Sequence, residues 1–170
     1  MVRVEQVLDS WKAIRQDAAT AVEEFPAGEL NFRPTPEVDS FGQIALHILN
    51  AGAALTGMML AGEDDFTAPG FRDRMKEHAT GLTVEAGAAE LAKAMRESLE
   101  RRASQLAAQP AEFFAHMVTR FDGQRLTRLE MLQFIKEHEL THRSQLFLYL
   151  RLKGIVPVTT RRRMAQQAGK

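Results

Sequence analysis

The chain has 170 residues, which is enough for one domain with a buried core of its own. Basic and acidic residues number 22 each, so the formal net charge is zero and no overall field would draw the protein to nucleic acid or to an acidic membrane. Cysteine is absent, which excludes disulfides, thiolate metal sites and a cysteine nucleophile and suits a reducing compartment. Any metal must be held by His, Asp or Glu.

Residues 4–25 have apolar side chains at helical spacing and predict a first amphipathic helix that Pro26 ends. Arg15 falls among the charged residues assigned to its solvent face. The N-terminal segment has neither the apolar run nor the cleavage site of a secretory signal. We therefore expect a cytoplasmic protein.

A second helix is expected from Phe41 to about Ala61, because Ser40 and Gln43 have the spacing of a capping box. The segment has no charged residue and is as long as a membrane span, but polar residues and glycines dilute its hydropathy, so we expect a core helix and no membrane partner. His47 lies in its middle among apolar and small residues. It is either a metal ligand or a buried histidine bonded to a carbonyl. Gly52 and Gly57 indicate close packing against another helix.

The polar segment Glu63–Leu82 predicts a long connection with one short helical turn, of a length that often borders a functional site. A third helix is expected from Thr83 to Pro110. Beyond it, short β-like runs flank a hairpin turn at Asp122-Gly123. His78 is expected at the surface, and His116 is a weak candidate for a fourth ligand.

The fourth helix, Glu130–Gly154, starts at a second capping box and is interrupted on its apolar face by two histidines. His138 and His142 are four residues apart, so their side chains lie about 40° apart around the helix axis with Cβ atoms roughly 5–6 Å apart. Both imidazoles could point to one place inside a bundle, which is metal-ligand geometry. The alternative is that each is a core histidine bonded to a carbonyl or water.

These elements predict an all-α protein, a four-helix bundle with one long crossover connection. The bundle domain is expected to cover residues 1–158. Residues 159–170 form a basic C-terminal tail, whose three arginines at 161–163 we interpret as a frayed, solvated terminus.

Three stretches coincide with a known family: SFGQ ahead of His47, FDGQRLTR at the hairpin, and HELTHRSQLFLYLRLKGIVP on the fourth helix. Together with LNFRP, they make the chain resemble the DinB-like family of metal-binding four-helix bundles along nearly its whole length. Members often have histidine where Thr141 stands and glycine where Ser144 stands.

The resemblance implies a metal triad of His47, His138 and His142 and a divalent ion, first zinc or nickel, with iron or manganese as further options. It also implies a bundle that often dimerises, and some relatives use low-molecular-weight thiols. A homodimer is further suggested by apolar residues beyond those that one helix seam needs: Leu46, Leu49, Leu60, Phe134, Phe147 and Leu148.

Three neutral imidazoles leave coordination positions open, the pattern of catalytic sites. We therefore expect a metal-dependent transferase, isomerase or hydrolase that activates a small thiol or water and acts on a small-molecule substrate, without a nucleic-acid partner. The rival is a non-catalytic metal- or ligand-binding bundle that acts in stress response through a partner, and a third possibility is a purely structural bundle. No catalytic residue beyond the ligands can be assigned, because Glu139 points about 100° away from His138.

Overall fold

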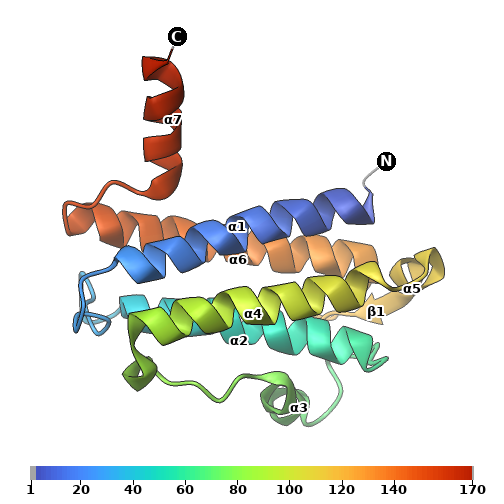
Figure 1. Cartoon of the computed structure of the whole chain (residues 1–170). Helices are drawn as coiled ribbons and strands as arrows, with labels where there is room; N and C mark the ends of the chain where they lie inside the picture. Colours follow the sequence, from blue (N-terminus) through green and yellow to red (C-terminus); the bar gives the residue numbers. More distant parts are fainter. Residues whose placement is uncertain (1–2, 170) are drawn as a thin grey trace.

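The computed structural model describes residues 3–169 and has a bundle of four long helices (Figure 1). The expected all-α fold and its four main helices are confirmed, with ends within a few residues of those expected. The helices are α1 (Val4–Glu24), α2 (Phe41–Leu60), α4 (Gly87–Ala107) and α6 (Arg128–Leu152).

Shorter elements surround the bundle. A two-stranded antiparallel hairpin pairs Val118 with Leu126 at the predicted turn, where Gly123 takes a φ of 83°. The shorter elements are α3 (Phe71–His78), the 3-10 turn η1 (Val84–Ala86), α5 (Ala111–Ala115), β1 (Met117–Thr119), β2 (Arg125–Thr127) and α7 (Val158–Ala168).

The order of the helices around the bundle explains the long connection. α1 packs beside α4 and α6, and α2 packs beside the same two helices, so α1 and α2 lie on a diagonal. Figure 1 shows α2 and α4 running in the same direction. After the end of α2 the chain must therefore run back along the length of the bundle before α4 can begin. The segment that contains α3 makes this crossover, as predicted.

Local signals set where the two helices that carry the triad histidines begin. Ser40 and Gln43 form a complete capping box ahead of α2, and Thr127 and Glu130 form another ahead of α6. Each box satisfies backbone N–H groups that have no partner within the helix. Gly154, with a φ of 75°, follows the end of α6 and turns the chain away.

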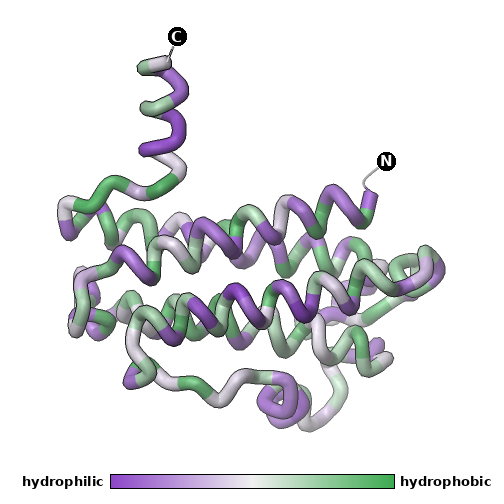
Figure 2. The backbone as a smooth tube through the Cα atoms, in the orientation of Figure 1, coloured by the Kyte–Doolittle hydropathy of each residue, from purple (hydrophilic) through white to green (hydrophobic). Residues whose placement is uncertain are grey.

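α2 is the central helix of the core. Figure 2 shows it as predominantly hydrophobic along its length. It is the one described helix long and apolar enough to cross a membrane, but 72% of that window is buried within the protein. An apolar helix enclosed by its neighbours is what a bundle core requires.

A buried ion pair links the four long helices. The Arg15 guanidinium donates from Nε to Glu139 Oε2 at 2.8 Å, and a second nitrogen contacts the other carboxylate oxygen. It also donates to the backbone carbonyls of Ile48 at 3.1 Å and Met95 at 3.2 Å. Both charged side chains are at most 1% exposed. The expectation that Arg15 faces solvent was wrong, because its face of α1 packs on α4 and α6.

This ion pair divides the core into two apolar clusters. One cluster contains Phe41 and Leu146, and the other contains Trp11, Met58 and Met131. Gly52 faces the ion pair, and a Cβ there would lie 2.4 Å from both an Arg15 nitrogen and a Glu139 oxygen. The predicted close packing at this glycine is confirmed, although its neighbours are side chains rather than a helix backbone.

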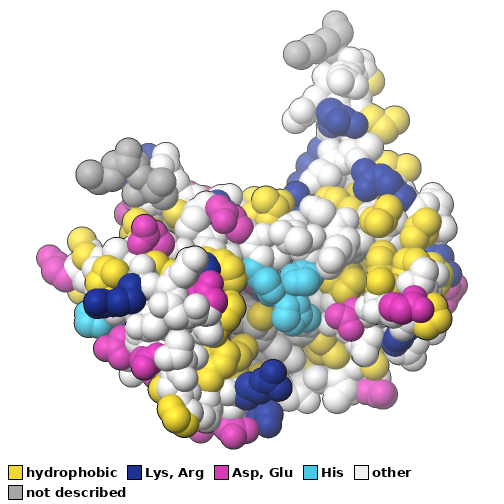
Figure 3. Space-filling model, turned by 180° about the vertical axis from the view of Figure 1, so that it is seen from behind, with side chains coloured by type: hydrophobic (Ala, Val, Ile, Leu, Met, Phe, Trp, Pro, Cys, Tyr) yellow, Lys and Arg dark blue, Asp and Glu magenta, His cyan; other side chains and the backbone are white. Residues whose placement is uncertain are grey.

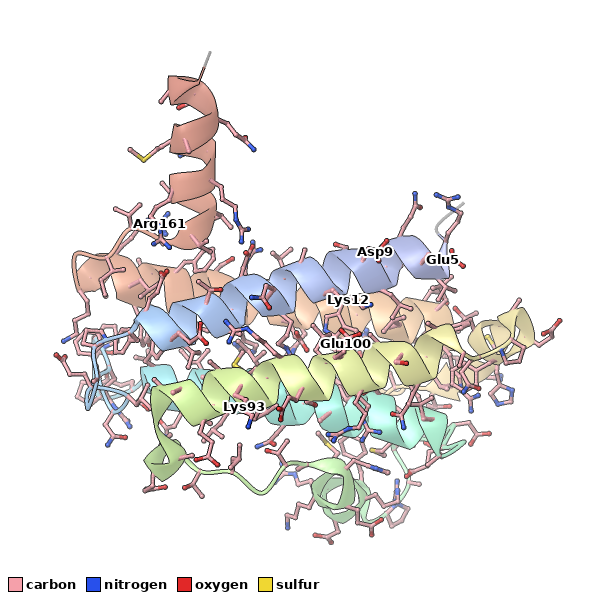
Figure 4. The ribbon with its side chains drawn as sticks, in the orientation of Figure 1. Glu5, Asp9, Lys12, Lys93, Glu100 and Arg161 are labelled. Carbon is pink, nitrogen blue, oxygen red and sulfur yellow. The ribbon has the colours of Figure 1, made fainter. Side chains whose placement is uncertain are left out.

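The basic tail is helical, which corrects the expectation of a frayed terminus. α7 extends away from the bundle (Figure 1) and has no buried residue, so it is solvated as expected. Its first turns are held by charge: Arg161 pairs with Glu24, and Arg162 donates to Asp17 at 2.7 Å. Figure 4 labels Arg161 where α7 leaves the bundle.

The apolar residues that suggested a homodimer are mostly used within one chain. Leu49 and Phe147 are buried, and Leu46, Leu60 and Phe134 are partly buried. Leu148 is the exception, at 54% exposed, and it has exposed apolar neighbours along the chain in Leu152 and Val156. The homodimer stays a prediction, with this end of α6 as its remaining basis.

We predict that Arg15→Met lowers the free energy of unfolding by about 3–5 kcal/mol, because it leaves the Glu139 carboxylate buried without a counter-charge. Denaturant unfolding followed by circular dichroism measures the loss. The double variant Arg15→Met, Glu139→Leu should recover most of it. The control is Arg96→Met, which removes a partly exposed pair with Glu23 and should cost about 1 kcal/mol or less. Equal losses in the two single variants would contradict the prediction.

Candidate functional site

Three histidines from two helices meet on one face of the bundle. His47 comes from the middle of α2, and His138 and His142 lie one turn apart on α6. Nε2 of His138 lies 2.9 Å from Nε2 of His47 and 3.1 Å from Nε2 of His142. One nitrogen of each ring lies within 4.8 Å of the other two. Figure 3 shows a histidine cluster near the middle of the face seen from behind.

The triad lies at the surface, which corrects the expectation that both α6 imidazoles point inside the bundle. His47 is exposed, and His138 and His142 are partly exposed. Glu139 occupies the buried position on α6, so the residue before it is turned by about 100° toward the edge of the helix. The rings therefore converge in a position that solvent can reach.

The ring of His142 is oriented by a neighbouring side chain. Its Nδ1 atom lies 2.7 Å from Oε1 of Gln145, one turn further along α6. An amide oxygen can only accept a hydrogen bond, so Nδ1 carries the proton. Nε2 is then left with its lone pair facing the other two rings, the tautomer that a metal ligand needs.

Two of the three rings, those of His138 and His47, have lowered pKa values. The pKa of His138 is lowered to about 4, chiefly by burial and in smaller part by the charges that His142 and His47 would carry when protonated. Although His47 is exposed as a residue, neighbouring atoms remove part of its ring from water, and this partial desolvation together with the charge of protonated His142 lowers its pKa, against a smaller opposing effect of Asp39. At neutral pH these two imidazoles are therefore already deprotonated, so each has a free lone pair and a metal ion can bind without first displacing a proton.

Two hollows open beside His47 on the side of α3. The first, of about 210 Å³, is apolar and reaches His138; the second, of about 300 Å³, also touches α3. The first is lined by His47, Ala51, Leu55, Phe71, Met75, Phe121, Phe134 and His138, and the second by His47, Asn50, Ala51, Ala54, Arg72, Met75, Lys76 and Ala79. The small residues expected around His47 include Ala51 and Ala54, which line these hollows, and the crossover connection borders them as expected.

A third hollow opens on the other side of the triad, beside His142. It has a volume of about 560 Å³ and lies between the connector ahead of α2 and the last turns of α6. Its polar lining includes Glu37, Asp39 and Gln145, and the Tyr149 hydroxyl donates to the Asp39 carbonyl at 2.9 Å, which holds the connector in place. The triad is thus accessible from two directions.

Hydrogen bonds hold α3 over the site. After α3, the backbone N–H and the hydroxyl of Thr80 both donate to Asn50 Oδ1 on α2, at 3.1 and 2.9 Å. Before α3, the chain pairs with the hairpin, because Thr119 donates to the Asp64 carbonyl at 2.7 Å and accepts from Phe66 at 2.8 Å. Both ends of the crossover are therefore tied to the elements that carry the site.

The other histidines and the nearest carboxylate are not part of this arrangement. His116 is exposed and lies 3.6 Å from Asp64, so the weak suggestion of a fourth ligand is not supported. His78 packs against Gly57 and is partly buried, not fully at the surface. Glu139 is held by Arg15 inside the core, which agrees with its exclusion as a general base.

Comparison with known proteins identifies the family. The sequence profile of the DinB family matches residues 1–168. The chain belongs to the DinB family. No curated protein sequence matches it.

Solved structures agree with a DinB fold. A DinB-like protein from Bacillus subtilis, YjoA, superposes with a TM-score of 0.68 at 19% identity, over 88% of this chain and 92% of that one. The mycothiol-dependent maleylpyruvate isomerase superposes with a TM-score of 0.63 at 14% identity, over 85% of this chain but only 61% of the isomerase. A histidine-to-alanine variant of that isomerase gives a TM-score of 0.65. At these identities, the likeness is one of fold.

Sequence reasoning missed two side chains that shape the site. Gln145 follows His142 by three residues, and that helical spacing is a signal that could have found it. Arg15 follows Leu8 and Trp11 at steps of three and four and precedes Ala18 and Val22 in the same way. That spacing places Arg15 on the apolar face of the first helix, but because it is charged it was expected on the solvent face.

We predict that the metal-free protein loses stability as the pH falls from about 6.5 toward 4. Over that range the unfolded chain binds a proton at His138 and the folded chain does not, because its pKa is lowered to about 4, so acid favours unfolding. Denaturant unfolding at a series of pH values measures this slope. His138→Gln should flatten it, whereas His116→Gln, at an exposed site, should leave it. An unchanged slope in His138→Gln would contradict the prediction.

Proposed function

We propose that this DinB-family protein is a metal-dependent enzyme in which His47, His138 and His142 hold one divalent ion. The observation that supports the proposal is the convergence of three Nε2 atoms, with separations of 2.9 and 3.1 Å about His138. Two lone pairs that face each other at such distances repel unless a proton or a cation lies between them. The purely structural alternative requires His138 to donate a proton from Nε2 to a neighbouring ring, which one Nε2–H can do fully for only one of its two neighbours at a time.

The donor set fits a divalent transition metal. Nitrogens about 2.0–2.1 Å from a tetrahedral zinc ion are roughly 3.3 Å from one another. The two separations about His138, 2.9 and 3.1 Å, are close to this value, and the three ligand nitrogens all lie within 4.8 Å of one another. Neutral imidazoles suit zinc and nickel, which we propose first, and also iron. Gln145 provides the acceptor on the far side of His142 that metal-bound histidines usually have.

The proposed chemistry is activation of a small thiol or water. A divalent ion with three neutral ligands lowers the pKa of a bound thiol or water. Around it, the chain provides access from both sides and two carboxylates, Glu37 and Asp39, in the hollow beside His142. These are the acidic groups we propose for proton transfer, since Glu139 is engaged by Arg15.

The thiol is suggested by one structural neighbour. The isomerase of the same fold is mycothiol-dependent, and a low-molecular-weight thiol is a co-substrate that the 560 Å³ hollow beside His142 could admit. The rival function is a metal-binding protein without catalysis. It is favoured by the absence of a carboxylate in contact with the triad within residues 3–169, and metal loading together with a thiol-transfer assay separates the two.

We predict that the purified protein contains about one divalent ion per chain and that His138→Ala removes it. The helices should persist, because the apolar core does not use this ring. Inductively coupled plasma mass spectrometry and circular dichroism measure the two properties. Gln145→Leu should weaken metal binding by about 10–100-fold, because it removes the acceptor that orients His142. His116→Ala is the matched control, and full metal content in His138→Ala would refute the triad.

We predict further that the ion has an open coordination position. Three protein ligands leave a tetrahedral shell incomplete, and the hollows give small molecules a route to it. The visible spectrum of cobalt-substituted protein should therefore change when azide or a small thiol is added. A spectrum that neither addition alters would mean a closed shell, and the enzyme proposal would then give way to the binding protein.

A further inference from the structure

The two hollows on the α3 side of the triad differ in chemistry and share a wall. His47, Ala51 and Met75 line both. A molecule near His47 can therefore occupy one hollow with one group and the other hollow with another.

The 210 Å³ hollow is built to hold an apolar ring. Phe71, Phe121 and Phe134 follow one another with ring centroids 6.2 and 5.7 Å apart, and Phe134 lies 6.3 Å from the His138 ring. Phe121 is 46% exposed, so part of its face lacks an apolar neighbour. Apolar protein cavities of about 150 Å³ bind benzene, so a six-membered ring is within the size of this hollow.

The neighbouring 300 Å³ hollow has a positive rim. Arg72 and Lys76 line it from successive turns of α3, and no carboxylate does so among residues 3–169. Arg72 has no ion-pair partner in that part of the chain, whereas Lys76 contacts Asp73 at 3.0 Å on the exposed side of α3. Figure 3 shows basic side chains near the histidine cluster on the same face.

We propose that this pair of hollows is the binding site for the electrophilic substrate, and that the substrate is an organic anion with an apolar, ring-sized group. The apolar group lies against Phe71, Phe121 and Phe134, and the anionic group lies beside Arg72 and Lys76. Its reacting atom is then held near His47 and His138. The role of this molecule as a substrate rests on the proposed function; the binding site itself does not.

The chemical reason for the assignment is complementarity on two sides. An apolar ring gains from leaving water for the aromatic hollow, in proportion to the apolar area that it buries. A carboxylate gains from Arg72, which has no ion-pair partner among residues 3–169, and from Lys76, whose partner Asp73 does not line the hollow. A polar neutral molecule gains from neither, so the site discriminates against it.

The test is a calorimetric titration of the full-length protein with phenylacetate and with its neutral analogue phenylacetamide. Each titration is made on the protein as purified and after removal of metal with a chelator. Phenylacetate should bind about three- to tenfold more tightly than phenylacetamide in both preparations. Acetate, which lacks the ring, should bind more weakly than either.

Three variants separate the two contributions. Arg72→Gln, Lys76→Gln should bring the affinity for phenylacetate down to that for phenylacetamide and leave the amide unchanged. Phe121→Ala should weaken both ligands about fivefold, because both use the ring site. Lys93→Gln is the matched control, since Lys93 lies on the opposite face, labelled in Figure 4, and should change neither affinity.

The outcomes distinguish this proposal from the proposed function. Equal affinities for the two ligands, or a phenylacetate affinity that the double variant does not alter, would overturn the anion site. Binding that disappears with the metal would mean that the carboxylate is a metal ligand, which would also overturn it. If the protein as purified contains no divalent ion and still prefers phenylacetate in this way, the anion site stands and the metal-dependent enzyme is refuted.

Discussion

One buried guanidinium contacts all four long helices of this bundle. Arg15 on α1 pairs with Glu139 on α6 and donates to carbonyls of α2 and α4, at the level where the two apolar clusters of the core are separated. Apolar cores accept alternative packings of similar volume, but a buried charge must keep its partner within hydrogen-bonding distance. The pair therefore restricts how the helices can be rotated and aligned along their axes.

That alignment places the triad. Ile48, whose carbonyl Arg15 contacts, follows His47, and Glu139 follows His138. Holding these two residues toward the centre turns the histidine before each of them to the edge of its helix. Gly52 is part of the same arrangement, since a side chain there would occupy the space of the ion pair. The buried Arg15–Glu139 pair and the accessible histidine triad thus both follow from the same rotation of α2 and α6.

The environment of the triad comes from segments that are not part of the bundle. The crossover brings Phe71 and Arg72 over α2, the hairpin contributes Phe121, and the connector ahead of α2 contributes Asp39 on the other side. Such segments can change without disturbing the core. Proteins that share this bundle can therefore differ in these walls, which is why likeness of fold to an isomerase does not identify a reaction for this chain.

The sequence by itself determined the helices, their caps, the hairpin turn and the crossover, because helical periodicity and the two capping boxes at Ser40 and Thr127 are local signals. It also singled out the three histidines, through the spacing of His138 and His142 and the family resemblance. Only the tertiary structure decided that Arg15 is buried, that the triad lies at the surface and that α7 is a helix held by charge. These three features depend on which residues from distant segments of the chain meet. A charge can be buried at a tolerable cost in free energy only when its partner is in place, and the partner of Arg15 is 124 positions away.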